Sequence, residues 1–189
     1  SLLSVMDKYE CYSIIFSSSA TVYKPQNLSL IKEEDSLEPL TPYGKTKLSI
    51  EFILKDLYAS NIKKWRIGNL RYFNPVGAHK SGLLGENPKG NASNLFPAIN
   101  RVIKKEQEKL LVFGNSWPTK DGTCVRDFIH VMDLAEAHMA TLEHLLMNEP
   151  KFLTLNIGTG IGTSVLEIIN KFKEIGIELP LLFVDKRSG

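Results

Sequence analysis

Two apolar runs separated by an amphipathic segment constrain the fold of this chain more than any other feature of its sequence. The first run, YSIIFSSSA at 12–20, is continuously apolar before it ends in small hydroxyl residues. Such a run is typical of a strand in a parallel sheet, since both faces of that sheet are covered. The segment 43–58 carries apolar residues at helical spacing behind Pro42, and 65–77 again has the pattern of a buried strand, broken by Pro75 and Gly77. Strand, helix and strand in this order predict parallel pairing with a right-handed crossover.

The alternation of helices and strands continues to the end of the chain. A stretch rich in Gly, Asn and Pro at 77–94 has no hydrophobic period and predicts a long loop. After it the sequence predicts helices at 94–108 and 133–147. A glycine turn and a further helix, capped at Thr163 or Ser164, are predicted within 159–176. Strands are predicted at 110–114, 128–131, 153–158 and 181–184. This regular alternation predicts an α/β fold.

Charge and cysteine content argue against several classes of function. With 23 Lys and Arg against 21 Asp and Glu, the formal net charge is +2, so no broad surface for nucleic acid is expected. Short clusters such as Lys104 and Lys105 predict solvated helix surfaces. Cys11 and Cys124 lack metal-binding or disulfide spacing, which favours a reducing cytoplasm and no metal. No apolar run is long enough to span a membrane, and the start lacks the features of a signal peptide.

The segment PYGKTK at 42–47 places Tyr43 and Lys47 four positions apart. A free tyrosine has a pKa of about 10, so it needs a shift of roughly three units to act as a base near neutral pH. A lysine one helical turn away lies on the same face, and at low effective dielectric its charge favours the phenolate. By itself this spacing fits an ordinary surface pair better, so the neighbouring motifs must decide between the two interpretations.

The segment SSSATVY at 17–23 follows the first predicted strand at its carboxyl end. Ligands in open α/β sheets bind outside the carboxyl ends of strands, and serine hydroxyls there can bond a substrate oxygen or a ribose. Ser19 precedes Tyr43 by 24 residues, which is one crossover in such a fold. The alternative is that these hydroxyls only satisfy backbone groups at the end of the strand.

Ser19, Tyr43 and Lys47 together match the triad pattern of the short-chain dehydrogenase/reductase superfamily. Within its extended branch, the chain closely resembles the UDP-glucose 4-epimerase family, which is named UDP-galactose 4-epimerase for the reverse direction. The segments that carry the likeness, in order, are FSSSATVY, PYGKTK, LRYFNPVGAH, FGNSWPTKDGTCVRDFIHVMDLAEAH and LNIGTG. The likeness covers essentially the whole chain.

The resemblance implies an α/β fold made of the C-terminal part of an NAD-binding Rossmann-type parallel sheet and most of a smaller sugar-nucleotide-binding subdomain. Residues 1–76 would form the partial Rossmann core. Residues 77–189 would form mostly the UDP-sugar region, with segments that return to the Rossmann sheet. The activity implied is the interconversion of UDP-glucose and UDP-galactose through transient oxidation at sugar C4 by a tightly bound NAD. The full-length protein would be a homodimer with a UDP-sugar as its partner, without nucleic acid or membrane.

The same resemblance assigns roles to individual residues. Tyr43 would exchange the proton of the sugar 4-hydroxyl, Ser19 would bond the same oxygen, and Lys47 would bond the nicotinamide ribose and keep Tyr43 acidic. The residues implied at the nicotinamide end of NAD are Ser17, Ser19, Tyr43, Lys47, Tyr72 and Pro75. The residues implied for the UDP-sugar are Ser19, Tyr43, Asn74, Asn94, Leu95, Leu111, Phe113, Arg126 and Arg187.

Structural alternatives exist for several of these residues. Arg126 could form an ion pair with the neighbouring Asp127, and Phe113 could be an ordinary core residue. His130 and His138 are expected to be structural, because neither belongs to the triad.

The chain also lacks parts of the family pattern. The glycine-rich turn that cradles the NAD pyrophosphate, and the acidic residue that follows it, do not occur, and TGIG at 159–162 is not that turn. We therefore expect an interior piece of an epimerase subunit that binds NAD poorly and turns over slowly or not at all by itself.

Three other functions share parts of this sequence pattern. A 4,6-dehydratase needs an Asp-Glu pair after the serine, where this chain has Ala20 and Thr21. A non-catalytic NAD-binding protein on the same scaffold would be expected to lack the Tyr43 and Lys47 pair. A 4-epimerase of another UDP-sugar, an N-acetylhexosamine or a pentose, stays open.

Overall fold

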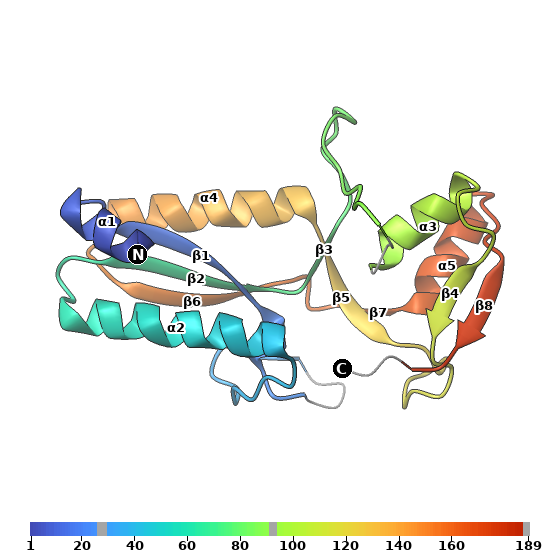
Figure 1. Ribbon diagram of the computed structural model, residues 1–189, viewed down its shortest axis with the longest axis horizontal. Helices are drawn as coiled ribbons and strands as arrows, with labels where there is room; N and C mark the ends of the chain where they lie inside the picture. Colours follow the sequence, from blue (N-terminus) through green and yellow to red (C-terminus); the bar gives the residue numbers. More distant parts are fainter. Residues whose placement is uncertain (26–29, 91–93, 187–189) are drawn as a thin grey trace. The chain divides into compact units, whose positions relative to one another are not determined.

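The computed structural model describes residues 1–25, 30–90 and 94–186. The chain forms two compact units and passes between them after Phe73, after Val131 and after Gly158 (Figure 1). The first unit contains Ser1–Phe73 and Met132–Gly158, and the second contains Asn74–Val131 and Thr159–Gly189.

The first unit is built on a sheet of three parallel strands in the order β1-β2-β6. Its strands are β1 (Ser13–Ser19), β2 (Arg66–Tyr72) and β6 (Phe152–Ile157), and its helices are α1 (Leu2–Lys8), the short 3-10 helix η1 (Ala20–Val22), α2 (Pro42–Ser60) and α4 (Val131–Met147). The long helices α2 and α4 cover opposite faces of this sheet (Figure 1). The predicted α/β fold with a parallel sheet is therefore confirmed.

Helix α2 begins where the sequence predicts it. The Thr41 side chain accepts a hydrogen bond of 3.1 Å from the Gly44 amide, and Pro42 occupies the first turn, where its missing N–H is not needed. On the sheet side, Leu54 packs with Trp65 and Ile67 in a buried cluster. Each such side chain stabilises the packing of helix on sheet by roughly 1.5–3 kcal/mol.

The predicted strand at 65–77 is in fact two strands that belong to different units. The Phe73 amide still donates to Ile157 O at 3.0 Å, but the next residue begins β3 (Asn74–Val76), which pairs with Phe128 and its neighbours. Pro75 has no N–H to give to a ladder, so it suits an edge strand rather than the middle of a sheet.

The second unit combines a three-stranded and a two-stranded sheet. Strands β3, β5 (Val125–His130) and β7 (Gly162–Ser164) form the first, while β4 (Leu110–Phe113) and β8 (Leu181–Val184) pair in parallel. Helices α3 (Leu95–Ile103) and α5 (Val165–Glu174) complete the unit. Its core consists of Ile99, Val102, Leu110, Val112 and Ile169.

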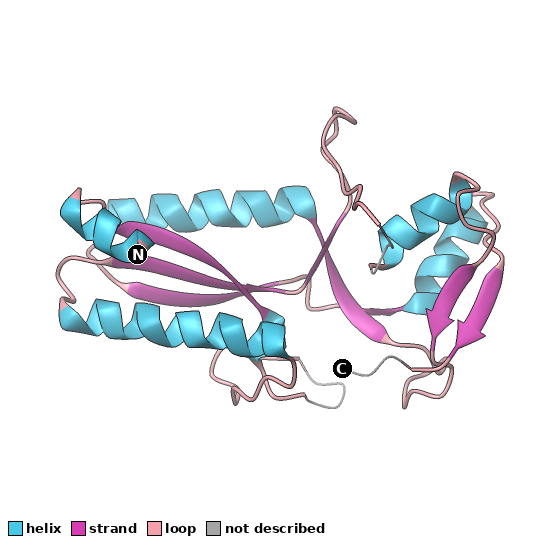
Figure 2. Ribbon diagram, in the orientation of Figure 1, coloured by secondary structure: helices cyan, strands magenta, loops and turns pink. Residues whose placement is uncertain are grey.

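Some boundaries in the second unit differ from the predicted ones. Helix α3 ends at Ile103 rather than at 108, because Lys105 adopts a left-handed conformation with φ 60°. Strand β5 begins at Val125 rather than at 128, because its first residues pair with β7. The described part of the predicted loop, 77–90, contains no helix or strand (Figure 2).

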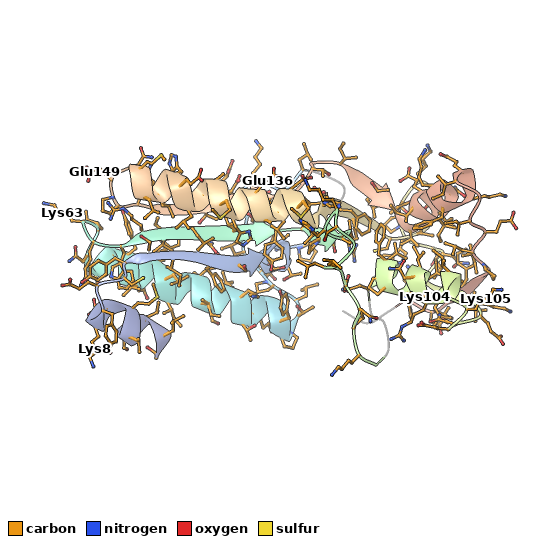
Figure 3. The ribbon with its side chains drawn as sticks, turned by 90° about the horizontal axis from the view of Figure 1, so that it is seen from above. Lys8, Lys63, Lys104, Lys105, Glu136 and Glu149 are labelled. Atoms are coloured by element: carbon orange, nitrogen blue, oxygen red, sulfur yellow. The ribbon has the colours of Figure 1, made fainter. Side chains whose placement is uncertain are left out.

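Three of the four clustered lysines lie on solvated surfaces as predicted. Lys63, Lys104 and Lys105 are exposed, and Lys104 and Lys105 lie at the end of α3 (Figure 3). Lys64 differs, because it is partly buried and pairs with Asp7 at 2.7 Å. Within the described ranges, no helix has both the length and the apolar character required to cross a bilayer.

A polar contact joins the loop before β5 to the start of α5. Ser164 caps α5, as predicted, and its hydroxyl donates to the Asp121 carboxylate, which also accepts from Thr123 N at 2.8 Å. Burial by itself would raise the pKa of Asp121, but the hydrogen bonds from Ser164 and Thr123 outweigh it and lower that pKa.

Gly68 in β2 allows α4 to approach the sheet closely. A Cβ at this position would lie 2.7 Å from both Ile15 Cδ1 and Thr141 Cγ2. We expect Gly68→Ala to lower the free energy of unfolding by about 1–3 kcal/mol, because the added methyl overpacks this contact. The midpoint of urea unfolding measures the effect. Gly85→Ala, in an exposed loop, is the matched control, and equal midpoints for both variants would contradict the packing described here.

Candidate active site

The first turn of α2 lies against η1, directly after β1. A Cβ on Gly44 would be 2.6 Å from Thr21 O and 2.8 Å from Pro39 Cβ, so only a glycine permits this approach. Tyr43 and Lys47 are thereby held beside the carboxyl end of β1, where the sequence predicts the site.

Lys47 connects α2 to that strand end. Its Nζ donates a 2.8 Å hydrogen bond to Ser17 O, and it lies 5.2 Å from the centroid of the Phe16 ring and 5.5 Å from that of Tyr43. Among the described residues, no carboxylate forms an ion pair with Lys47. The positive charge is therefore directed at Tyr43 and the strand end instead of being neutralised by an acid.

Tyr43 and Ser19 both retain hydrogen-bonding capacity. Tyr43 is 50% exposed, and in the described part of the chain its hydroxyl has no hydrogen-bond partner. Ser19 is buried, and its Oγ accepts from Thr21 N at 3.2 Å and from Thr21 Oγ1 at 3.0 Å. Both bonds are donated to Ser19, so its own hydroxyl proton remains available to another acceptor.

Ser17 and Tyr72 lie on neighbouring strands and share a contact with His138 of α4. The Ser17 hydroxyl is 3.1 Å from His138 Nε2, and the rings of Tyr72 and His138 have centroids 6.2 Å apart. His138 Nδ1 lies 2.8 Å from Leu134 O, which can only accept, so Nδ1 carries the proton of this bond and the other ring nitrogen, Nε2, faces Ser17.

No local signal in the sequence indicated the contact of His138 with Ser17, because the two residues are 121 positions apart. The structure thus brings Ser17, Ser19, Tyr43, Lys47 and Tyr72 together at one end of the first unit's sheet. The other predicted site residues that it describes belong to the second unit.

Strands β3 and β5 carry three of these residues in the second unit. The side-chain amide of Asn74 donates from Nδ2 to the backbone oxygen of Asp127 at 3.0 Å, and Pro75 is the next residue on β3. Arg126 is exposed, and its Nη1 donates to Val125 O at 2.8 Å. The alternative of an Arg126 pair with Asp127 is not observed, since the described residues include no ion pair of Arg126 with a carboxylate.

Helix α3 and strand β4 carry the remaining four. Asn94 caps α3 without a side-chain capping bond and donates to Glu86 Oε1 at 2.8 Å, and Leu95 is the first helical residue. Leu111 and Phe113 alternate along β4 with the buried Leu110 and Val112, so both point away from the core. Arg187 lies outside the described residues.

The glycine-rich turn TGIG is occupied by a carboxylate of the protein itself. Asp127 accepts from Thr159 N at 3.0 Å, from Thr159 Oγ1 at 2.7 Å and from Gly160 N at 2.8 Å. The amides that a phosphate loop would present to a ligand therefore bind Asp127 instead. Across 1–25, 30–90 and 94–186, no group of three or more His, Cys, Asp or Glu side chains could hold a metal ion.

Comparison with known proteins identifies the family of the chain. The NAD dependent epimerase/dehydratase family matches residues 1–158. The chain belongs to this family. The resemblance to UDP-glucose 4-epimerases is confirmed by two curated members: the chain is 49% identical over 189 residues to the UDP-glucose 4-epimerase of Bacillus subtilis, and 46% identical over 190 residues to an Arabidopsis thaliana bifunctional UDP-glucose 4-epimerase and UDP-xylose 4-epimerase.

Solved structures of the epimerase family show the same fold. A UDP-glucose 4-epimerase from Stenotrophomonas maltophila, with bound NAD and formylated UDP-arabinopyranose, matches with TM-score 0.94 at 46% identity. A second, from Bifidobacterium longum in complex with NAD+ and UDP, matches with TM-score 0.91 at 46% identity. Both cover all of this chain and 56% of the solved chain. The two curated relatives likewise match this chain over its whole length, but the chain spans only 55% and 54% of their own lengths.

The bonds to Asp127 predict a local effect of its replacement. We expect Asp127→Asn to lower the free energy of opening the turn at 159–160 by about 1.5–3 kcal/mol, because an amide cannot replace the charged acceptor on both oxygens. Hydrogen–deuterium exchange of the Thr159 and Gly160 amides measures this. Asp185→Asn, exposed in the same unit, should leave both amides as protected as before, and equal protection in the two variants would contradict the prediction.

Proposed function

We propose that the full-length protein interconverts UDP-glucose and UDP-galactose by transient NAD-dependent oxidation at C4 of the sugar. The observation that carries the proposal is the placement of Lys47, whose ammonium lies between Ser17 O and the ring of Tyr43 without a carboxylate partner in the described chain. The identity of 49% with a UDP-glucose 4-epimerase supports the choice of substrate.

The donor set at the end of β1 and β2 fits the nicotinamide end of NAD. It offers hydroxyls that can bond an amide or a ribose, a lysine that can bond ribose oxygens, and the aromatic face of a half-buried tyrosine. The residues proposed to hold this end are Ser17, Ser19, Tyr43, Lys47, Tyr72 and Pro75. When bound, NAD supplies the hydride acceptor for C4 and returns the hydride in the second half of the reaction.

The residues of this chain then handle the proton at the sugar 4-oxygen. Tyr43, as the phenolate, accepts the proton of the 4-hydroxyl and gives it back to the same oxygen at the end of the cycle. Ser19 donates its free hydroxyl proton to that oxygen throughout. The 4-keto sugar must turn its other face before reduction, so these contacts hold the oxygen without fixing the ring.

Lys47 supplies the charge that favours the Tyr43 phenolate. At 5.5 Å from the ring centroid, a unit charge interacts with the phenolate by about 1 kcal/mol in bulk water and by about 3 kcal/mol at an effective dielectric of about 20. A bound substrate that excludes water from the half-exposed Tyr43 would therefore strengthen the electrostatic interaction between the Lys47 charge and the Tyr43 phenolate.

The second unit supplies the proposed binding residues for the UDP part. Arg126 is exposed and has no carboxylate partner among the described residues, so its guanidinium is available to a diphosphate. Leu111 and Phe113 present one apolar face of β4, which suits uracil. The full proposed set is Asn74, Asn94, Leu95, Leu111, Phe113, Arg126 and Arg187, together with Ser19 and Tyr43 at the sugar.

A second substrate, a UDP-pentose, is favoured by one specific observation. The Arabidopsis thaliana relative that is 46% identical to this chain is named for both UDP-glucose and UDP-xylose 4-epimerase activity. Assay of UDP-xylose beside UDP-glucose on one preparation tests this extension.

We also propose that the full-length protein is a cytoplasmic homodimer in which α2 joins a helix bundle. Exposed apolar residues on α2, Ile50, Phe52 and Ile53, support a surface that becomes covered. The free cysteines Cys11 and Cys124 support a reducing compartment.

Replacement of Tyr43 tests the chemistry directly. In the full-length protein, Tyr43→Phe should reduce turnover of UDP-galactose by about 10²–10⁴-fold, because only the acid–base group is lost. UDP affinity, measured by calorimetry, should stay unchanged. Tyr9→Phe, an exposed tyrosine at the end of α1, is the matched control, and normal turnover of Tyr43→Phe would remove Tyr43 from the mechanism.

Replacement of Arg126 tests the diphosphate contact. Arg126→Ala should weaken UDP binding by roughly 1.5–3 kcal/mol, the typical contribution of a hydrogen bond to a charged group. Hydride transfer at saturating substrate should slow much less. Lys171→Ala, which removes an exposed cation of α5, serves as the control, and an unchanged affinity for UDP in Arg126→Ala would refute the assignment.

A further inference from the structure

A buried charged pair lies beneath α2, one helical turn beyond Lys47. Glu51 is 4% exposed and Arg71 is 5% exposed. Arg71 Nε lies 3.1 Å and 3.2 Å from the two carboxylate oxygens of Glu51, and Nη2 donates to Oε2 at 2.6 Å. The fully buried Ser18 hydroxyl donates to the other oxygen, Oε1. The carboxylate is therefore fully occupied inside the protein, which excludes direct contact with a substrate.

These three side chains join the elements that carry the proposed active site. Glu51 belongs to α2, the helix of Tyr43 and Lys47. Ser18 belongs to β1 and stands between Ser17, whose carbonyl accepts from Lys47, and Ser19. A single carboxylate thus ties the catalytic helix to the strand end that it must face.

Arg71 extends the same network to the segment that leads into α2. Its Nη1 donates to Tyr23 OH at 2.9 Å and to Glu33 O at 3.0 Å. Burial raises the pKa of Tyr23, so the phenol keeps its proton and donates it to Asn156 Oδ1 at 2.6 Å. The segment between β1 and α2 is thereby fastened to β2 and β6.

A buried ion pair of this kind contributes little to stability compared with apolar residues of the same volume, because both charges lose their hydration. Its hydrogen bonds are directional, however, whereas the apolar contacts of Leu54 with Trp65 and Ile67 tolerate a small slide of the helix. The pair is therefore suited to determining the position of α2 along the sheet, whereas the apolar contacts supply the free energy of packing.

We propose that Glu51 and Arg71 are positioning residues that fix α2 against β1, so that Tyr43 and Lys47 meet Ser17 and Ser19 in the reactive geometry. The inference rests on the proposed epimerase function. A misplacement of about 1 Å can cost about 10²-fold in rate, so a slide much shorter than one helical turn is enough to matter.

The test replaces the pair by apolar residues of similar volume in the full-length protein, Glu51→Leu together with Arg71→Met. We expect a thermal midpoint equal to or above that of the parent, since such replacements are often neutral or stabilising. Turnover should fall by about 10²-fold at an unchanged KM. UDP affinity measured by calorimetry should stay the same, because the pair does not touch the nucleotide.

Replacement of an exposed ion pair by the same two apolar residues is the matched control. Lys24 Nζ and Glu38 Oε2 are 2.9 Å apart, with side chains 57% and 62% exposed. Lys24→Met with Glu38→Leu should leave the thermal midpoint, turnover and KM unchanged. A stable Glu51→Leu, Arg71→Met protein with normal turnover would overturn the proposal.

Ser18→Ala keeps the proposal testable if the double variant does not fold. It removes only the bond between Glu51 and β1, and turnover should fall by roughly 10- to 100-fold at constant KM, in line with the loss of one hydrogen bond to a charged group. Unchanged turnover in Ser18→Ala would likewise refute the positioning role. Normal turnover of Tyr43→Phe would instead refute the epimerase mechanism itself, so the two failures can be told apart.

Discussion

The packing of α2 across β1 and β2 is the interaction on which the rest of the first unit depends. Apolar contacts around Leu54 supply the free energy, and the glycine at position 44 removes the Cβ that would otherwise hold the helix away from Thr21. Parallel pairing of β1 with β2 then brings Ser17 and Ser19 beside the start of the helix. The Lys47 bond to Ser17 O is a consequence of this packing rather than its cause.

Two carboxylates perform similar tasks in the two units. Glu51 joins α2 to the two strands of the first unit, and Asp127 joins β5 to the turn at 159–160 in the second. The carbonyl of Asp127 also accepts from the Asn74 side chain. Asn74 and Thr159, which follow the first and third crossings of the chain, therefore both bond to Asp127 of β5, the strand before the second crossing. In both places the carboxylate is occupied by hydrogen bonds within the protein.

Much of the fold was predictable because its signals are local. A continuous apolar run predicted β1, apolar residues at helical spacing behind Pro42 predicted α2, and a cap at Thr163 or Ser164 predicted α5. The segment 65–77 was predicted as a strand broken by Pro75 and Gly77, because apolar content cannot show that the chain already leaves the sheet after Phe73. The early end of α3 at Ile103 was missed for a related reason: a left-handed Lys105 has no distinctive residue type.

The sequence by itself determined the order of strand, helix and strand, and the spacing of Tyr43 and Lys47 on one helix face. Both follow from the spacing of apolar and polar residues over a few positions of the chain, which is enough to predict a helix or a strand. Only the tertiary structure decided that His138 contacts Ser17, that Glu51 and Arg71 fasten α2 to β1, and that Asp127 fills the glycine turn. These contacts join residues between 20 and 121 positions apart, so they depend on the path of the backbone and on burial, which no local pattern encodes.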